Sequence, residues 1–169
     1  LPRAGAWDIV QLTAKAYDLA SAIAAIRPAM GEGTAVLPLL NGLSHIETLA
    51  ASFGASRVLG GLAKIQATLT PEGVVRHLAP LQVLEFGELD GALSARVQSL
   101  ERAFDATPVR AEAVADIAGR MWEKLVFLGT LAMATVLMRA SLGEIAAAPG
   151  GQGWLDRLLE RNVAVAAAH

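Results

Sequence analysis

Short apolar runs of β-forming residues alternate with helical segments in the first third of the chain, and this alternation constrains the fold most strongly. Residues 7–13 and 34–40 are typical of short buried strands, and residues 57–59 begin a third strand. Between them, residues 19–26 carry apolar side chains at helical spacing, and a Ser-His-Ile-Glu capping box at residue 44 predicts a helix to about residue 53. Short strands that alternate with helices favour a parallel sheet with helical crossovers.

After the Gly60-Gly61 pair the pattern changes to longer apolar and alternating runs around the turn at residues 70–73. This pattern predicts an antiparallel extension of the sheet. We expect its strands at residues 64–69, 74–78 and 81–86, with a further strand at 109–113. An amphipathic helix is expected over residues 94–104.

From Asp116 onward the sequence predicts only helices. Asp116 is a suitable N-cap for a helix that runs to about Arg139. Ser141 and Glu144 form a second capping box at the start of a short helix, and a third helix is expected over residues 152–169. We therefore expect an α/β part followed by an all-α part.

Composition excludes several classes of function. The 14 Lys and Arg residues nearly balance 16 Asp and Glu, so there is no basic field for nucleic acid. The chain has no cysteine, which excludes a disulfide scaffold, a thiolate metal site and a cysteine nucleophile. His45, His77 and His169 share no ligand spacing, so we expect no metal site and interpret these residues as surface or structural.

The apolar run from Leu125 to Met138 raises the question of a membrane. Its 14 residues fall short of the ~20 that a spanning helix needs. We expect a buried core helix instead, in which Met121, Trp122, Met133 and Met138 are packing residues, and no membrane partner.

Lys15 and Asn41 each follow a predicted strand, and parallel sheets carry their functional loops at the carboxyl ends of strands. Lys15 is a candidate for contacting a phosphate or carboxylate, and the alternative is a solvated loop lysine. Asn41 precedes a glycine, and its alternative is a turn residue that supplies a positive φ or an Asx hydrogen bond.

Lys124 is the third candidate, because an apolar helix follows it and its stem is expected to be half-buried. A lysine in such a site can have its pKa lowered toward neutrality and can then exchange protons. The alternative is a snorkelling lysine paired with Glu123 or Asp116.

Five segments, taken in order, resemble the ketopantoate reductase (2-dehydropantoate 2-reductase) family. They are Thr13-Ala-Lys-Ala-Tyr-Asp-Leu19, Leu37-Pro-Leu-Leu-Asn-Gly42, Val58-Leu-Gly-Gly61, Met121-Trp-Glu-Lys-Leu125 and Leu142-Gly-Glu144. The resemblance implies that residues 1–114 are the C-terminal part of a Rossmann-like NADP-binding domain and that residues 115–169 begin an all-helical substrate and dimerisation domain. It also implies a cytoplasmic homodimer that reduces a 2-keto acid with NADPH in pantothenate biosynthesis.

Carried over residue by residue, Lys15 resembles the lysine that contacts the cofactor, and Asn41 resembles the asparagine between nicotinamide and substrate. Lys124 resembles the general acid. Hydride attack on a 2-keto group builds negative charge on the oxygen, which an ammonium can stabilise and then protonate.

The chain departs from the family pattern in two ways. The Gly-x-Gly-x-x-Gly cofactor loop is absent, so we expect the chain to be a piece of a longer protein that starts near the fourth strand of the sheet. Leu128, Ala132 and Leu142 stand where the family has asparagines, while Thr135 offers one hydroxyl on roughly the same helix face for substrate. These departures leave open a less polar keto substrate or a non-catalytic dinucleotide-binding or interaction domain.

Overall fold

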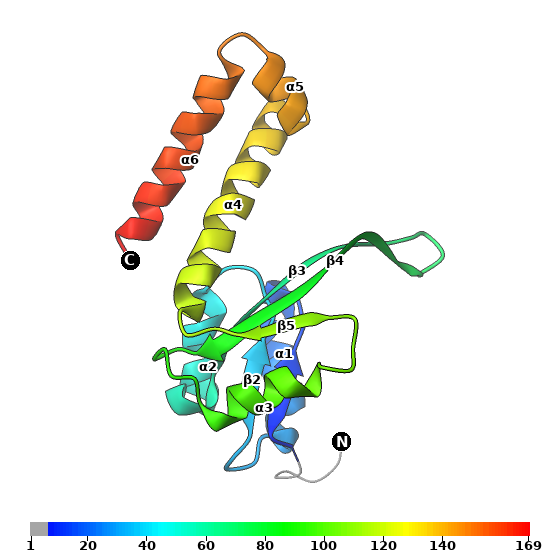
Figure 1. Ribbon diagram of the computed structural model, residues 1–169, viewed down its shortest axis with the longest axis vertical. Coiled ribbons are helices and arrows are strands. Elements are labelled where there is room, and N and C mark those ends of the chain that lie inside the picture. The colour runs from blue at the N-terminus through cyan, green and yellow to red at the C-terminus, as the bar shows by residue number, and fades with distance from the viewer. Residues whose placement is uncertain (1–6) are drawn as a thin grey trace. The chain divides into compact units, whose positions relative to one another are not determined.

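A computed structural model describes residues 7–169 and confirms the predicted parallel strands (Figure 1). Strand β1 (Ile9–Leu12) pairs in parallel with β2 (Ala35–Pro38), and helix α1 (Leu19–Ile26) forms the crossover between them. An isolated parallel bridge from Val36 to Val58 joins β2 to the next segment of the sheet. Short 3-10 helices lie in the connections: η1 (Ala16–Asp18), η2 (Arg27–Ala29) and η3 (Ala55–Arg57).

The antiparallel extension is also confirmed. Strand β3 (Leu59–Leu69) pairs antiparallel with β4 (Val75–Glu88), and β4 pairs in parallel with β5 (Arg110–Ala113). The strands are fewer and longer than the sequence predicts. β3 joins the strand expected to begin at residues 57–59 to the one expected at 64–69, and β4 joins those expected at 74–78 and 81–86.

The Gly60-Gly61 pair lies inside β3, where the sequence predicted a break. A Cβ atom on Gly61 would lie 2.5 Å from Leu37 Cδ1 and 2.7 Å from the Pro38 carbonyl oxygen. Glycine is therefore needed where β3 passes close to β2, which is a packing requirement that the strand pattern of β3 does not reveal.

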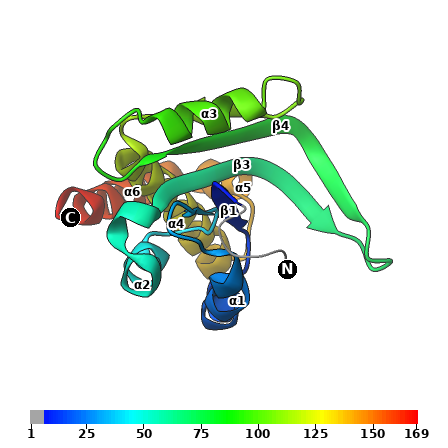
Figure 2. The same cartoon turned by 90° about the horizontal axis from the view of Figure 1, so that it is seen from below.

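Helices cover both faces of this sheet. On one face, α1 and α2 (Ser44–Phe53) pack on a buried cluster of residues from β1, β2 and the segments next to them. On the other, α3 (Ala95–Ala103) packs through Val97 on Phe86 of β4. Figure 2 shows α3 on the opposite side of β3 and β4 from α1 and α2. The clusters comprise Leu12, Ile23, Val36, Leu40, Leu49 and Val58 on the first face and Ala35, Leu37, Leu59, Phe86 and Val97 on the second.

The capping box predicted at Ser44 is wrong. Helix α2 has Leu43 as its N-cap, Ser44 is already helical, and the Leu43 side chain makes no capping hydrogen bond. The chain turns at Gly42, which has a φ of 86°, and the amide of Ile46 donates to the Leu43 carbonyl. The helix therefore begins one residue too early for Ser44 to act as the cap.

The predicted helices of the all-α part are confirmed as α4 (Ile117–Met138), α5 (Leu142–Ala147) and α6 (Gly151–Ala167). Asp116 Oδ1 accepts a hydrogen bond from the Gly119 amide at 2.9 Å, as expected of an N-cap. The Ser141–Glu144 capping box is present with both of its hydrogen bonds.

Contacts between Cα atoms divide the chain into two compact units, and the division falls between Met121 and Trp122. The first turn of α4 belongs to the first unit because Ile117 and Met121 pack with Leu62 of β3. In the second unit, the Asn162 side-chain amide donates to Thr130 Oγ1 at 2.8 Å and the rings of Trp122 and His169 stack 5.7 Å apart, which joins α6 to α4. The assignment of residues 1–114 and 115–169 to two functional domains stays a prediction.

The expectation of a buried core helix is wrong for most of α4. Only 11% of its most apolar 18-residue window is buried, and Val136 and Leu137 are about 70% exposed, at 72% and 69%. Met133 and Met138 are about half-exposed, at 45% and 48%, whereas Met121 is buried as predicted. By length and composition alone, α4 is the one helix within residues 7–169 that could cross a membrane, a test that core helices of soluble proteins also pass.

A partly buried ion pair anchors α3 to the end of β4 and gives a pH-dependent prediction. Arg96 Nε donates to Glu88 Oε1 at 2.7 Å, and this hydrogen bond lowers the pKa of Glu88 from its ordinary value of 4.5, with Ser94 assisting. A depressed folded-state pKa gives stability that is present above pH 4.5 and is lost as the pH falls through the folded-state pKa. Glu88→Gln should therefore flatten the fall in melting temperature below pH 4.5, whereas Glu47→Gln, on an exposed side chain, should leave the wild-type pH dependence unchanged.

Candidate functional site

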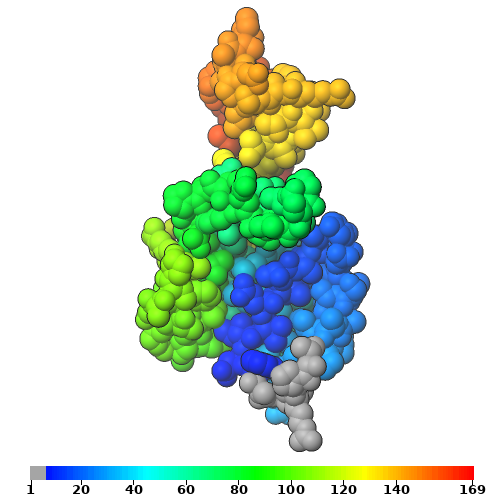
Figure 3. Space-filling model, turned by 90° about the vertical axis from the view of Figure 1, so that its right-hand side faces the viewer, coloured from blue at the N-terminus to red at the C-terminus, as the bar shows by residue number. Residues whose placement is uncertain are grey.

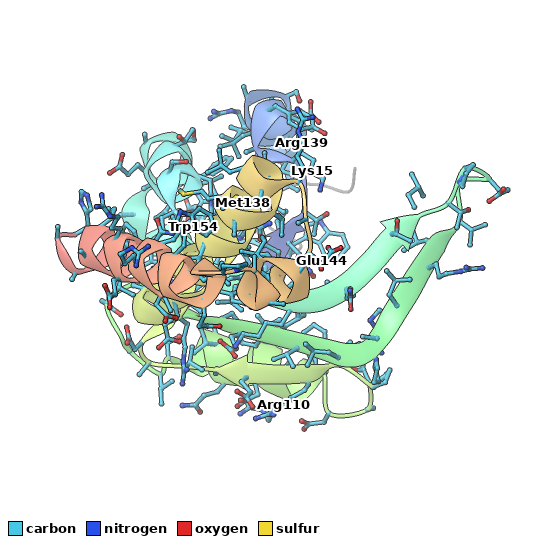
Figure 4. The ribbon with its side chains drawn as sticks, turned by 90° about the horizontal axis from the view of Figure 1, so that it is seen from above. Lys15, Arg110, Met138, Arg139, Glu144 and Trp154 are labelled. Atoms are coloured by element: carbon cyan, nitrogen blue, oxygen red, sulfur yellow. The ribbon has the colours of Figure 1, made fainter. Side chains whose placement is uncertain are left out.

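Two of the predicted site residues, Lys15 and Asn41, follow adjacent parallel strands at the carboxyl edge of the sheet. The amide of Leu39 donates to the carbonyl of Leu12 at 2.9 Å, so β1 and β2 end at the same level. Lys15 is exposed and extended (φ −72°, ψ 153°) immediately before η1, and Figure 4 labels its side chain. The structure thus brings the loops that carry Lys15 and Asn41 to one edge.

Asn41 does not adopt the positive φ that was the alternative to a ligand-binding role. Gly42, not Asn41, has the positive φ, and Arg139 is the one non-glycine with a positive φ in the described part of the chain. Asn41 is exposed, and its carboxamide makes no hydrogen bond to any residue within 7–169. Its donor and acceptor are therefore available to a ligand.

Helix α2 begins next to this edge, and its first turn contains a residue whose burial the sequence did not predict. His45 is only 3% exposed, and desolvation lowers its pKa, so the imidazole is neutral at physiological pH. Its Nε2 atom is buried without a hydrogen-bond partner among the described residues. This burial fits the interpretation of His45 as a structural residue. No feature of the sequence indicates that its Nε2 atom lacks a hydrogen-bond partner in the described part of the chain.

A second buried polar group lies on the sheet. Glu85 of β4 is 6% exposed and forms an ion pair with Lys64 of β3 through Oε1, while its Oε2 has no partner among the described residues. Sequence reasoning missed this pair. The available signal was a lone acidic residue between the apolar Leu84 and Phe86 of a strand.

The other two predicted residues, Lys124 and Thr135, lie on α4 in the second unit. Lys124 is half-buried, as expected. Leu128 and Thr135 follow it at spacings of four and eleven residues, which places all three on one helix face. Thr135 Oγ1 donates to the Leu131 carbonyl at 2.8 Å, so its hydroxyl keeps acceptor capacity but uses its proton within the helix.

An open cavity of ≈500 Å³ lies at the junction of α5 and α6. Met138, Glu144 and Trp154, which Figure 4 labels, are among its lining residues. The Glu144 carboxylate is occupied by the capping box, and its hydrogen bonds from Ser141 lower its pKa. The cavity therefore offers no free acid or base from Glu144. Within residues 7–169 no group of three His, Cys, Asp or Glu side chains is placed to hold a metal.

Comparison with known proteins identifies the family. The family model of ketopantoate reductase PanE/ApbA matches residues 2–91. A 2-dehydropantoate 2-reductase of Halobacterium salinarum is 34% identical over 95% of this chain and 52% of its own length, and the uncharacterized oxidoreductase YkpB of Bacillus subtilis is 32% identical over 92% of this chain and 51% of its own. The chain thus spans about half the length of these curated relatives.

A solved structure agrees with the sequence relatives. The crystal structure of 2-dehydropantoate 2-reductase from Porphyromonas gingivalis superposes with a TM-score of 0.82 at 27% identity, covering 92% of this chain and 53% of that one. The order of strands and helices and the following helical part are therefore those of a Rossmann-like fragment and the helices after it. With its N-terminal half matched by the family model, this chain belongs to the ketopantoate reductase family.

Proposed function

We propose that the protein to which this chain belongs is an oxidoreductase that reduces a 2-keto acid to a 2-hydroxy acid with a nicotinamide dinucleotide. The observation that carries the proposal is the placement of Lys15 and Asn41 at the carboxyl edge of β1 and β2 in a chain of this family. Relatives that bear the name 2-dehydropantoate 2-reductase support this reaction class.

The residues at this edge fit a polyanionic dinucleotide. Lys15 offers an exposed cation, Asn41 offers an exposed carboxamide, and the N-terminus of α2, where Leu43 supplies no capping side chain, adds partial positive charge. When bound, the reduced dinucleotide supplies the hydride. Lys15 would bind the cofactor, and Asn41 would orient the cofactor and the substrate.

We assign proton donation to Lys124. As the carbonyl carbon is reduced, negative charge grows on its oxygen, and the Lys124 ammonium stabilises that charge before it donates a proton to the oxygen. The net result is one new C–H bond and one new O–H bond, with Lys124 left neutral until solvent reprotonates it.

The helix face after Lys124 favours a less polar substrate. Leu128 and Ala132 follow it where a polar 2-keto acid needs hydrogen-bonding groups, and the Thr135 hydroxyl can accept a hydrogen bond from a substrate. Ketopantoate itself remains one candidate, and a 2-keto acid with a larger apolar group is the other.

Like the assignments above, the cellular setting is a proposal. We propose a soluble, cytoplasmic homodimer with NADPH as the reductant in pantothenate biosynthesis. The near-balance of charge and the absence of cysteine are compatible with this setting.

The full-length protein tests the proposed reaction directly. NADPH and NADH oxidation should be followed at 340 nm (~10² µM cofactor) with ketopantoate and with 2-keto acids of increasing apolar size. Turnover with at least one keto acid is expected. Dinucleotide binding without turnover on any of them would favour the second candidate, a non-catalytic dinucleotide-binding domain, which the apolar residues Leu128 and Ala132 motivate.

Lys15→Ala should weaken cofactor binding without changing the chemistry. Loss of one charge-assisted hydrogen bond costs about 1.5–3 kcal/mol, which corresponds to a roughly 10- to 150-fold higher Kd. Fluorescence titration of the reduced cofactor measures this change. Arg102→Ala, on an exposed helix position of the same unit, is the matched control and should bind as the wild type does. An unchanged Kd for Lys15→Ala would remove Lys15 from the cofactor site.

A further inference from the structure

Strand β3 continues past the point where β1 and β2 end, and it carries Lys64 there (Figure 1). The isolated bridge pairs Val36 of β2 with Val58 in parallel, and β3 runs on from Val58. Along the chain, Asn41 lies five residues beyond Val36, and Lys64 lies six residues beyond Val58. Because extended strands rise by about 3.3 Å per residue, Lys64 reaches the level of the Asn41 turn at the carboxyl edge of the sheet.

The side chains of Leu62, Lys64 and Glu85 share one face of the sheet. Leu62 and Lys64 are two residues apart on β3, and Glu85 of β4 is the cross-strand partner of Leu62. Leu43 and Ile46, at the start of α2, pack against the cluster that contains Leu62. The Lys64 side chain, one step further along β3, is 40% exposed. The ion pair therefore lies where the covered part of this face meets solvent.

Beyond Lys64 the β3–β4 hairpin leaves the body of its unit. Figure 2 shows it extending past the helices of that unit, and Figure 3 views it from its outer end. Lys64 is thus at the base of the hairpin, next to the carboxyl edge and not at the distant turn.

Glu85 holds the Lys64 ammonium from the buried side. Glu85 is 6% exposed, and its Oε1 accepts a hydrogen bond from Lys64 Nζ. A lysine ammonium has three N–H donors, and the other donors of Lys64 bond to no residue within 7–169. Lys64 is therefore a cation in a fixed position with donors left for a ligand.

Stability of the sheet does not account for this pair. Glu85 Oε2 is buried without a partner among the described residues, and an unsatisfied buried oxygen destabilises the folded state. A buried ion pair also loses hydration that an apolar pair of similar volume would not need to lose. Ligand binding by Lys64 gives a reason for charged residues at these two positions.

Two other cations of the first unit are occupied elsewhere. Arg57 donates to the backbone carbonyl of Thr34, before the start of β2, and Arg96 donates to Glu88. Lys15 lies at the carboxyl edge but is assigned to the cofactor. A 2-keto acid needs a donor for its carboxylate as well as groups at its keto oxygen, and no residue has yet been assigned to that carboxylate.

We propose that Lys64 binds the carboxylate of the 2-keto acid and that Glu85 is the positioning residue that fixes its ammonium. This inference rests on the proposed function and adds the group that recognises the acid end of the substrate. The keto carbon is bonded directly to the carboxylate carbon. An anchor at Lys64 therefore holds the reacting carbon close to the level of Asn41, which is assigned to orient cofactor and substrate.

The test replaces both partners, because Lys64→Ala alone would leave the buried Glu85 carboxylate without a counter-ion. Calorimetry on the full-length protein with oxidised cofactor measures the Kd of ketopantoate and of 2-ketoisovalerate, each beside its neutral amide. In Lys64→Met/Glu85→Gln the Kd of at least one acid should rise about 10- to 150-fold, the loss expected for a charge-assisted hydrogen bond. The Kd of its amide should stay within about threefold of the wild type, because the amide has no charge to lose.

Two further variants complete the experiment. Arg110→Met/Glu112→Gln removes another ion pair from the same sheet and should bind the acids as the wild type does. Lys64→Arg keeps a cation beside Glu85 and should retain the preference for acid over amide.

Four results would overturn the proposal. They are an unchanged acid Kd in Lys64→Met/Glu85→Gln, equal losses for acid and amide, a raised dinucleotide Kd in that variant, and a wild type that does not distinguish acid from amide, including one that binds neither. Equal losses would indicate a structural role, and a raised dinucleotide Kd would assign Lys64 to the cofactor. The proposed function fails by a different result, the absence of turnover with any keto acid, because these binding measurements involve no reaction.

Discussion

Lys124→Ala in the full-length protein should lower kcat by about 10²- to 10⁴-fold, the usual contribution of a positioned general acid. The dinucleotide Kd should stay within about twofold of the wild type, because Lys15 and Asn41 are assigned to the cofactor and lie in the other unit. Stopped-flow measurement of cofactor oxidation at saturating keto acid gives kcat, and fluorescence titration gives the Kd.

Two further variants distinguish proton donation from simple charge. Lys124→Arg keeps a cation but holds its proton too tightly to release it, so kcat should remain low even where substrate binding recovers. Arg139→Ala, at the exposed turn residue that follows the same helix, should retain wild-type kcat. Unchanged turnover in the Lys124→Ala enzyme would contradict the assignment of Lys124 as the general acid.

The second large effect concerns stability. Phe86 of β4 is fully buried against α3. Phe86→Ala should therefore lower the free energy of unfolding of the first unit by about 3–5 kcal/mol. Urea denaturation followed by far-UV circular dichroism measures the loss. Phe127→Ala removes the same atoms from a side chain that is 61% exposed and should cost less than about 1 kcal/mol.

Phe86→Leu keeps most of the buried volume and guards against a variant that does not fold. Its cost should lie well below that of Phe86→Ala, at about 1–1.5 kcal/mol. Equal losses for Phe86→Ala and Phe127→Ala would contradict the packing of this face of the sheet.

Local sequence patterns predict the structure correctly where the interactions that determine it join residues close together along the chain. The capping box at Ser141 and the N-cap at Asp116 involve residues three positions apart, and both are present. The parallel strands were predictable because a short apolar run between helices has few other stable arrangements. The capping box at Ser44 failed because the turn at Gly42 starts the helix one residue earlier.

Features set by distant residues could not be predicted. The need for glycine at position 61 comes from Leu37 and Pro38 on another strand. The exposure of α4 depends on what packs around it, which its own apolar pattern does not specify.

The sequence likewise predicts some features of the candidate site and not others. The strand pattern places Lys15 and Asn41 after the ends of strands, and the register of β1 and β2 shows that these two strand ends are adjacent. The role of Lys124 came from the family resemblance and stays a prediction. The unpartnered His45 nitrogen became visible only in three dimensions.

The strand connections also have a kinetic consequence. β3 and β4 are joined by a tight turn, whereas β1 with β2 and β4 with β5 are each joined through a helix. Closing the short β3–β4 turn costs less conformational entropy than closing the longer connection between β1 and β2. The hairpin is therefore expected to form first during folding and the β1–β2 pair later. The loops bearing Lys15 and Asn41 would then acquire their native arrangement among the last steps, and a slow-folding variant should recover hairpin amide protection before it recovers ligand binding.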